Sequence, residues 1–239
     1  MGPGVVGCGG EPGATQTSGG DFTVPEATVE LDLSCGSLEV TMADGIAWEA
    51  VTAMNEDGAP SIEASGGSLE LRSDSHGFPF TRDRQKWALS LGRDMTYDVS
   101  ASLNAADSTL DLSDGVFSRL ALKPNAGSVI INLSGAHVVD LDVSLNAGSA
   151  SIVIDADTEL AGVIGSNAGS IDFCAPADTA LRFTVDANLT FSHNLDESDL
   201  NESGNTFTSS GFESAEHRID LRLEGNAASF ELNPEEGCQ

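Results

Sequence analysis

Residues 125–128 read Asn-Ala-Gly-Ser, and the same four residues return at 146–149 and at 167–170, in steps of 21. A variant of this motif, Asn-Ala-Ala-Ser, stands at 226–229. Self-similarity at a fixed period indicates a repeat architecture, in which each unit is one supersecondary element. The turn positions marked by the motif, or reached from it by the same step, are Asn104, Asn125, Gly127, Asn146, Gly148, Asn167, Gly169, Asn188 and Asn226.

Apolar residues occupy fixed places between these motifs. An apolar triplet with a spacing of two follows each motif, and a second triplet stands ten residues later. A period of two is that of a β-strand with one buried face, so each unit is predicted to hold two short strands and two turns. In the unit that begins at Asn125 the triplets are Val129, Ile131 and Leu133, then Val139, Leu141 and Val143.

Such a unit cannot bury its own apolar face, but units stacked on one another pair strand to strand and build a continuous core. We therefore predict an all-β fold: a single-stack β-solenoid-like (β-helix) domain over 28–232, with regular 21-residue coils over 83–187. Glycine accepts the positive φ of a sharp turn, and stacked asparagine side chains are expected to hydrogen-bond as a ladder. An extra stretch rich in Asp, Glu, Ser and Asn predicts a projecting loop over about 192–210.

The segment before the repeats, residues 1–27, is rich in Gly, Ser, Thr and Pro, which predicts a flexible tether. Its Val5-Val6-Gly7-Cys8 resembles the lipobox of bacterial lipoproteins. Unless this match is a coincidence, we expect Cys8 to be lipidated and an apolar signal segment to precede Met1 in the natural gene. No apolar run is long enough to span a bilayer, and residues 233–239 are predicted to form a C-terminal tail. These features predict an exported protein of the cell surface or periplasm, attached to the membrane only through a lipid anchor.

Charge and cysteine content exclude several classes of protein. The chain has 38 Asp and Glu against 10 Lys and Arg, a formal net charge of -28, which repels nucleic acid and anionic membrane surfaces. Its four cysteines, Cys8, Cys35, Cys174 and Cys238, form no Cys-x-x-Cys pair, so a zinc site is not expected. Cys35 and Cys174 lie in apolar strand contexts and are interpreted as small buried hydrophobic residues. Disulfides remain the alternative, and the state of Cys238 is left open.

The sequence offers little catalytic chemistry. The four histidines share no repeat position, no serine or cysteine has an evident base beside it, and no phosphate-binding or dinucleotide motif is present. We therefore predict no enzymatic activity and no cofactor. Calcium is the one metal considered, because Asp155, Asp157 and Glu159, or the run 196–199, place several carboxylates close together. Solvated acidic turns are the favoured interpretation of these residues.

Three stretches together resemble a known family: residues 29–38, residues 87–91 (Trp-Ala-Leu-Ser-Leu), and the Asn-Ala-Gly-Ser units. They are similar to the bacterial toast-rack and adhesin-type β-repeat domains, of unknown function, which are related to modules of LiaF-type cell-envelope proteins. The resemblance implies a non-enzymatic envelope module, adhesin-like or an interaction scaffold, whose partner is an envelope protein or a glycan. It leaves two alternatives: an extracytoplasmic regulatory or sensory domain of a cell-envelope stress system, and a polysaccharide-acting β-helix enzyme.

Overall fold

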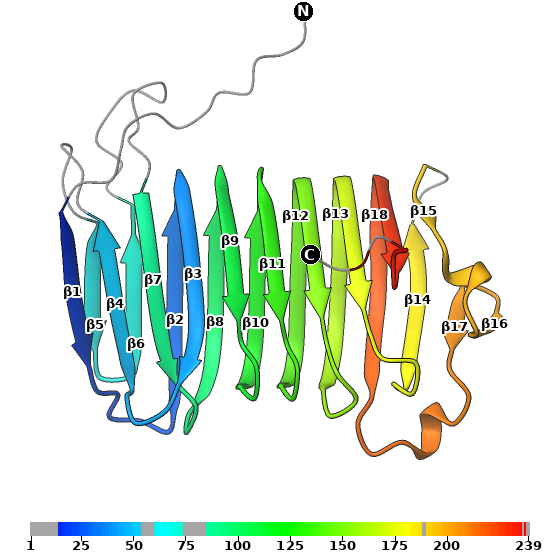
Figure 1. The fold of residues 1–239 in the computed structure, drawn as a ribbon, viewed down its shortest axis with the longest axis horizontal. Coiled ribbons are helices and arrows are strands. Elements are labelled where there is room, and N and C mark those ends of the chain that lie inside the picture. The colour runs from blue at the N-terminus through cyan, green and yellow to red at the C-terminus, as the bar shows by residue number, and fades with distance from the viewer. Residues whose placement is uncertain (1–13, 54–59, 74–84, 188–189, 236, 238–239) are drawn as a thin grey trace, which may run out of the picture.

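The computed structural model describes residues 14–53, 60–73, 85–187, 190–235 and 237. The fold is all-β, with eighteen strands and, in the described part, two short 3-10 helices, η1 (Leu195–Glu197) and η2 (Phe212–Ser214). Figure 1 shows the strands standing side by side in one long rack, from β1 at one end to β16 and β17 at the other. The expected all-β, solenoid-like class is confirmed.

One continuous sheet folds into two layers that face each other across the core. In order of pairing, the first layer contains β5 (Ser61–Ser65), β6 (Ser68–Arg72), β2 (Glu26–Leu33), β8 (Thr96–Leu103), β10 (Val116–Pro124), the first halves of β12 (His137–Val153), β13 (Glu159–Cys174) and β18 (Ile219–Leu232), then β14 (Leu181–Ala187), β17 (Thr206–Thr208) and β16 (Asn201–Ser203). The second layer contains β1 (Thr15–Gly20), β4 (Trp48–Ala53), β7 (Gln85–Gly92), β3 (Gly36–Ala43), β9 (Ala106–Asp111), β11 (Ser128–Asn132), the second halves of the three long strands, and β15 (Ser192–His193).

In the centre of the rack the strands are parallel, and their paired residues lie 21 apart in sequence. Leu120 pairs with Leu141, and Ala147 pairs with Ala168. This register places equivalent apolar residues in columns between the layers, so each column is continuous from coil to coil. Val143, Ile164 and Leu223 form one such buried column.

The order of the coils departs from the order of the chain at both ends. Strand β18 lies between β13 and β14, because Ile219 pairs with both Leu160 and Leu181. At the other end the coil of β2 and β3 lies between the coil of β6 and β7 and that of β8 and β9. The coils therefore stack in chain order only in the centre of the rack. The physical reason is that any apolar triplet fits any column, while the added loop length costs little closure entropy.

Two segments expected to be irregular are ordered. The region expected as a projecting loop, about 192–210, contains β15, η1, β16 and β17, and its Leu195 and Phe207 are buried in the core. Within the expected tether, residues 15–20 form β1, which pairs antiparallel with β4. Both expectations were wrong because these segments lack a long alternating pattern and gain their structure from a partner strand.

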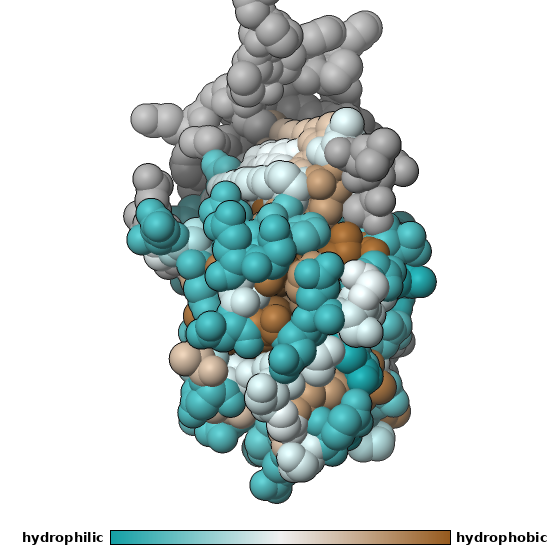
Figure 2. All heavy atoms as spheres, turned by 90° about the vertical axis from the view of Figure 1, so that its right-hand side faces the viewer, coloured by the Kyte–Doolittle hydropathy of each residue, from teal (hydrophilic) through white to brown (hydrophobic). Residues whose placement is uncertain are grey.

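The end of the rack that carries β14 to β17 is closed by side chains. Asn194 donates a hydrogen bond from Nδ2 to the carbonyl oxygen of Leu232 (2.9 Å) and accepts one at Oδ1 from the Leu232 amide (2.8 Å). This side chain thus takes the place of a neighbouring strand at the end of β18. The ring of Phe191 lies against Gly225, which has no Cβ to displace it. Figure 2 shows hydrophilic side chains over much of this end.

Both described cysteines, Cys35 and Cys174, are disulfide-bonded, so their interpretation as buried thiols is corrected. Cys35 precedes β3, and β9, β11 and β12 separate that strand from β13, which ends at Cys174. Four strand spacings amount to about 19 Å. A disulfide requires Cα atoms within about 7 Å, so the two cysteines belong to different disulfides.

Candidate functional site

In three consecutive coils the third position of the repeated turn is a glycine with positive φ. Gly127, Gly148 and Gly169 have φ values of +110°, +121° and +138°. A Cβ on Gly148 would lie 2.0 Å from the carbonyl oxygen of Gly127 in the adjacent coil. At these glycines the backbones of adjacent coils approach each other so closely that a larger residue would not fit.

The asparagines of the same turns form hydrogen bonds between coils. Asn125 donates to Oδ1 of Asn104 (2.7 Å), and Asn167 donates to Oδ1 of Asn146 (3.4 Å). Asn226 then donates to Oδ1 of Asn167 (2.8 Å), since β18 is the next strand in space. Asn188, expected at this place, lies outside the described residues. The side chains remain exposed, so the ladder lies along one edge of the rack.

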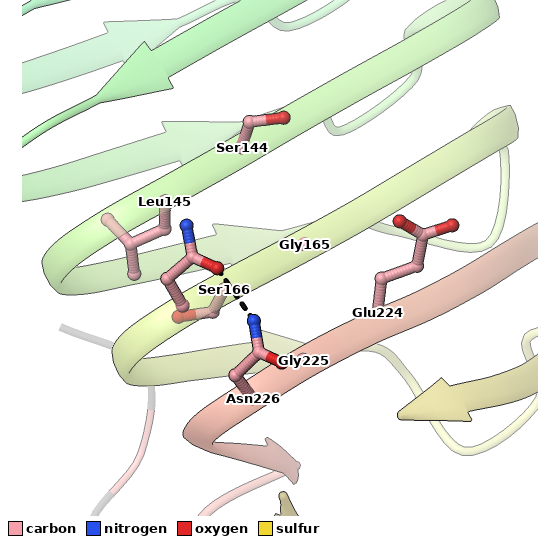
Figure 3. A pocket seen from close by; sticks show the side chains of 8 residues that line it. Ser144, Leu145, Gly165, Ser166, Glu224, Gly225 and Asn226 are labelled. Atoms are coloured by element: carbon pink, nitrogen blue, oxygen red, sulfur yellow. Dashed lines mark hydrogen bonds between the residues drawn. The ribbon is translucent and has the colours of Figure 1, made fainter. Parts of the chain in front are cut away.

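A polar hollow of about 250 Å³ lies beside this ladder, and Figure 3 shows the side chains around it. It exists because Gly165 stands between Ser144 and Glu224 on neighbouring strands. Ser144 donates a hydrogen bond to Asp142 (2.8 Å), and Glu224 lies 3.1 Å from Nε of Arg222. The Ser144 hydroxyl and the Glu224 carboxylate thus have partners on their own strands, whereas the buried hydroxyl of Ser166, which also lines the hollow, has no hydrogen-bond partner among the described residues.

The structure does not bring the suggested calcium ligands together. Burial raises the pKa of the Asp155 carboxyl, but hydrogen bonds from the Gly135 amide, the Thr158 hydroxyl and the Asp157 amide outweigh it and lower the pKa. Glu159 instead points to His137, with 2.9 Å between Oε2 and Nδ1. In the described ranges no group of three or more His, Cys, Asp or Glu is placed to hold a metal ion. The acidic turns have structural partners.

The second acidic run is likewise not a ligand set among the described residues. Asp196 lies in η1, and its Oδ1 is 3.6 Å from Nδ1 of His193.

A second groove, of about 460 Å³, lies on the outer face of the first layer beside η2. The guanidinium of Arg182 is stacked on the ring of Phe212, with 4.4 Å between Cζ and the ring centroid. It also bonds Asp220 through two nitrogens, with Nε to Oδ1 at 3.0 Å, and Nη1 lies 3.2 Å from Oε1 of Glu213. The hydrogen bond to Asp220 is the main cause that raises the pKa of Arg182. The lining consists of His137, Val138, Val139, Glu159, Leu160, Ala161, Arg182, Phe212, Arg218 and Asp220.

Sequence reasoning missed this groove because its residues come from β12, β13, β14, β18, η2 and the segment just before β18, which only the inserted position of β18 brings together. The one sequence signal was that Arg182, Arg218 and Arg222 are three of only ten basic residues. A carboxylate with an arginine or histidine is also what a polysaccharide-cleaving site requires. Here, however, Glu159 is held by His137, and Asp220 is held by Arg182. Both carboxyl groups of the groove lining therefore contact residues of the groove wall.

Cys8, expected to be lipidated, lies outside the described residues, so that expectation stays a prediction. No helix among the described residues is long and apolar enough to cross a bilayer.

Comparison with known proteins identifies the family. Residues 15–155 match the family described as the N-terminal domain of toast_rack, DUF2154. The chain belongs to the toast-rack family. The resemblance inferred from the sequence is thus confirmed, and the match covers β1 to β12, leaving β13 to β18 outside it.

Three solved structures are similar to this chain over most of its length. A candidate cell adhesion protein from Clostridium sporogenes is 12% identical with a TM-score of 0.58, covering 93% of this chain and 99% of that one. Candidate adhesins from Bacteroides fragilis (9% identity, TM-score 0.37, 92% and 96% covered) and Parabacteroides merdae (9%, 0.28, 92% and 95%) also match. The comparison with curated protein sequences gave no match. The similarity to the Clostridium structure, at 12% identity, shows that the two proteins share a fold.

Proposed function

We propose that this toast-rack protein is an exported, non-enzymatic module of the cell envelope, adhesin-like, whose rigid rack presents a binding surface to an envelope protein or a glycan. The observation that carries the proposal is the disulfide-bonded state of Cys35 and Cys174. Disulfides form and persist in oxidising compartments such as the periplasm and the cell surface, and are rare in the bacterial cytosol. The name of the Clostridium sporogenes structure, a candidate cell adhesion protein, agrees with such a role.

The non-enzymatic part of the proposal rests on the groove beside η2, which is where a polysaccharide-cleaving activity would have to reside. Both of its carboxylates have a partner in the groove wall: Oε2 of Glu159 lies 2.9 Å from Nδ1 of His137, and Asp220 accepts hydrogen bonds from Arg182. Acid–base catalysis needs a group that reaches the reacting bond and can exchange its proton, whereas these two carboxylates are directed to side chains of the groove wall.

The proposal is tested in two steps on the full chain. Cells that produce the protein are fractionated, and its thiols are labelled before and after reduction. We expect the extracytoplasmic fraction to contain protein whose Cys35 and Cys174 react only after reduction. Beads coated with the purified protein should then retain intact envelope fragments, whereas beads coated with the Cys35→Ser, Cys174→Ser double variant, unfolded by heat, should not. A cytosolic, fully reduced protein that retains no envelope material would contradict the proposal.

Two further measurements test the absence of enzymatic activity and the lipid anchor. Cleavage of a polysaccharide panel that is lost in Asp220→Asn would replace the binding role with an enzymatic one. The chain has four cysteines, so two separate intramolecular disulfides for Cys35 and Cys174 would use Cys8 as a partner, and such pairing and a thioether-linked lipid on Cys8 exclude each other. The intact mass of the membrane-associated protein decides between them. Loss of membrane association in Cys8→Ser, with the fold retained, is the result expected for a lipid anchor.

A further inference from the structure

Cys35 and Cys174 are disulfide-bonded, and the strand register together with the reach of the chain decides which sulfur each of them binds. The chain has two further cysteines, Cys8 and Cys238, and both lie outside the described residues. Four cysteines can pair within one chain in three ways. The described strands fix the places of Cys35, Cys174 and the residues nearest to the two termini, so each way can be compared with a distance.

Cys35 and Cys174 lie at opposite ends of the strands of the second layer. Thr41 of β3 stands in the same cross-strand row as Cys174, and β9, β11 and β12 lie between the two residues. Cys35 precedes Thr41 by six residues, which is about 20 Å along the strand. Four strand spacings add about 19 Å across the sheet. The Cα atoms of the two cysteines are therefore about 28 Å apart, which excludes a bond between them.

The C-terminal segment leaves the rack beside Cys174. Asn233, the residue after β18, accepts a hydrogen bond at Oδ1 from the Ala175 amide (2.8 Å). Its own amide donates to the carbonyl oxygen of Phe173 (2.9 Å). These two contacts hold Asn233 at one strand spacing, about 5 Å, from Cys174.

A turn limits how far the chain extends from Asn233. The Gly237 amide donates a hydrogen bond to the carbonyl oxygen of Pro234 (2.9 Å), and a turn of this kind keeps its end residues within about 7 Å. Cys238 can therefore lie at most about 15 Å from Asn233, since each trans peptide link adds about 3.8 Å. Cys35 is about 31 Å from Asn233, because five strand spacings separate them across the sheet and six residues along it. Cys238 can thus reach the neighbourhood of Cys174 but cannot bond to Cys35.

The N-terminal segment enters the rack on the side where Cys35 lies. β1 is parallel to β3, and its Thr15 is in line with Ser37, three strand spacings away. Thr15 is therefore about 16 Å from Cys35. Cys8 precedes Thr15 by seven residues, which span up to about 25 Å, so its sulfur can reach Cys35. Cys174 is about 36 Å from Thr15, beyond this reach.

We propose that the protein contains two disulfides, Cys8–Cys35 and Cys174–Cys238. The other two ways of pairing require either Cys35–Cys174 or Cys35–Cys238, and the distances exclude both. Each bond forms when two thiols lose two protons and two electrons. These reduce the disulfide of a thiol–disulfide oxidoreductase of the oxidising compartment to its dithiol. The first bond uses the sulfur of Cys8, so it takes the place of the lipid that the sequence suggests there.

The two bonds fasten the two ends of the chain to the rack. Terminal segments open most readily, and β1 at one end and the last residues of β18 at the other are such segments. A disulfide restricts the unfolded chain and keeps an opened strand near its place. This inference goes beyond the proposed function, since the pairing is the same whether or not the rack binds envelope material.

Peptide mapping of the full chain without reduction tests the pairing. The protein is isolated from the extracytoplasmic fraction, its free thiols are blocked in acid so that disulfides do not exchange, and the digest is analysed with and without reduction. We expect one linked species with Cys8 and Cys35 and another with Cys174 and Cys238, both lost on reduction. The intact mass should be lower than that of the reduced protein by two hydrogen atoms for each disulfide.

Two single variants provide matched controls for each other. Cys238→Ser should free the thiol of Cys174 and leave the Cys8–Cys35 species intact. Cys8→Ser should free the thiol of Cys35 and leave the other species intact. A Cys8→Ser variant that frees the thiol of Cys174 instead would overturn the pairing.

The outcomes separate this inference from the proposed function. A species that links Cys35 to Cys174 or to Cys238, a disulfide to a second copy of the chain, or a lipid on Cys8 overturns the pairing and leaves the envelope role intact. The two expected species, in a protein that retains no envelope fragments, support the pairing while the envelope role fails. A cytosolic protein with every thiol free overturns both.

Discussion

Replacing Gly148 with alanine tests the stacked-turn geometry directly. Gly148 has φ of +121°, where an L-residue is strained, and the new Cβ would lie 2.0 Å from the carbonyl oxygen and 3.1 Å from the carbonyl carbon and amide nitrogen of Gly127. These are backbone atoms of the adjacent coil, so no side-chain rotation relieves the contact. The two coils must move apart, or the turn must change its conformation.

The expected cost has two parts. A residue held in a sparsely populated backbone region costs about 1–3 kcal/mol. Forcing an extra carbon into packed structure costs about 1–3 kcal/mol more. The free energy of unfolding should therefore fall by about 2–6 kcal/mol, and the damage should spread to the coils on either side because each is stabilised by its neighbours.

Gly165→Ala is the matched control. Gly165 lies in the adjacent coil, its φ is not in the positive region, and a Cβ there would have its nearest neighbours at 3.8–3.9 Å, in ordinary contact. The same substitution should be neutral or stabilise the protein by about 0.4–1 kcal/mol, because alanine restricts the unfolded chain. The methyl group would occupy the polar notch of Figure 3.

Urea denaturation followed by tryptophan fluorescence and circular dichroism measures both variants against the parent. We expect a clearly lower midpoint for Gly148→Ala and an equal or higher one for Gly165→Ala. Equal midpoints for all three proteins would show that the turn glycines do not hold neighbouring backbones in close contact, and the stacked-turn account would be wrong.

Three further predictions follow from named contacts. Because the folded pKa of Asp155 is lowered, its carboxylate contributes stability above the unfolded pKa of about 3.9, and this contribution is lost as pH falls through the folded pKa. Asp155→Asn should thus have a lower free energy of unfolding than the parent at pH 7, and the difference should shrink in acid. A difference that does not change with pH would contradict this. Asn194→Ala loses both hydrogen bonds to Leu232 and should cost about 1–3 kcal/mol in urea unfolding; an unchanged midpoint would mean that the cap does not hold β18. Peptide mapping without reduction should find Cys35 and Cys174 in different disulfide-linked species, and a direct link between them would be incompatible with the order of the strands.

Chemistry at the surface was only partly predictable from the sequence. The spacing of Asp155, Asp157 and Glu159 is compatible with a cation site, but a spacing does not say which way a carboxylate points. Two of the three side chains hydrogen-bond or form ion pairs within the turn region and with the preceding coil. Arg182 and Asp220 are 38 positions apart and face each other only because β14 and β18 are neighbours. Local patterns cannot reveal such pairs.

The sequence by itself determined the strands, their buried faces and the turn. Alternation with a period of two fixes which side chains face the core, and the 21-residue step of Asn-Ala-Gly-Ser places a positive-φ glycine and a stackable asparagine at the same point of three consecutive coils. Both are local properties, and they suffice for the fold class and for the family.

Only the tertiary structure decided the order of the coils at the ends, the disulfide-bonded state of Cys35 and Cys174, the groove beside η2 and the edge strand β1. Apolar triplets in the same register are interchangeable as neighbours, so the sequence does not specify that β18 lies between β13 and β14. An edge strand such as β1, with no buried alternation of its own, becomes a strand only when β4 supplies its hydrogen bonds. These features depend on which segments meet in space, and that is set by the packing of the whole rack.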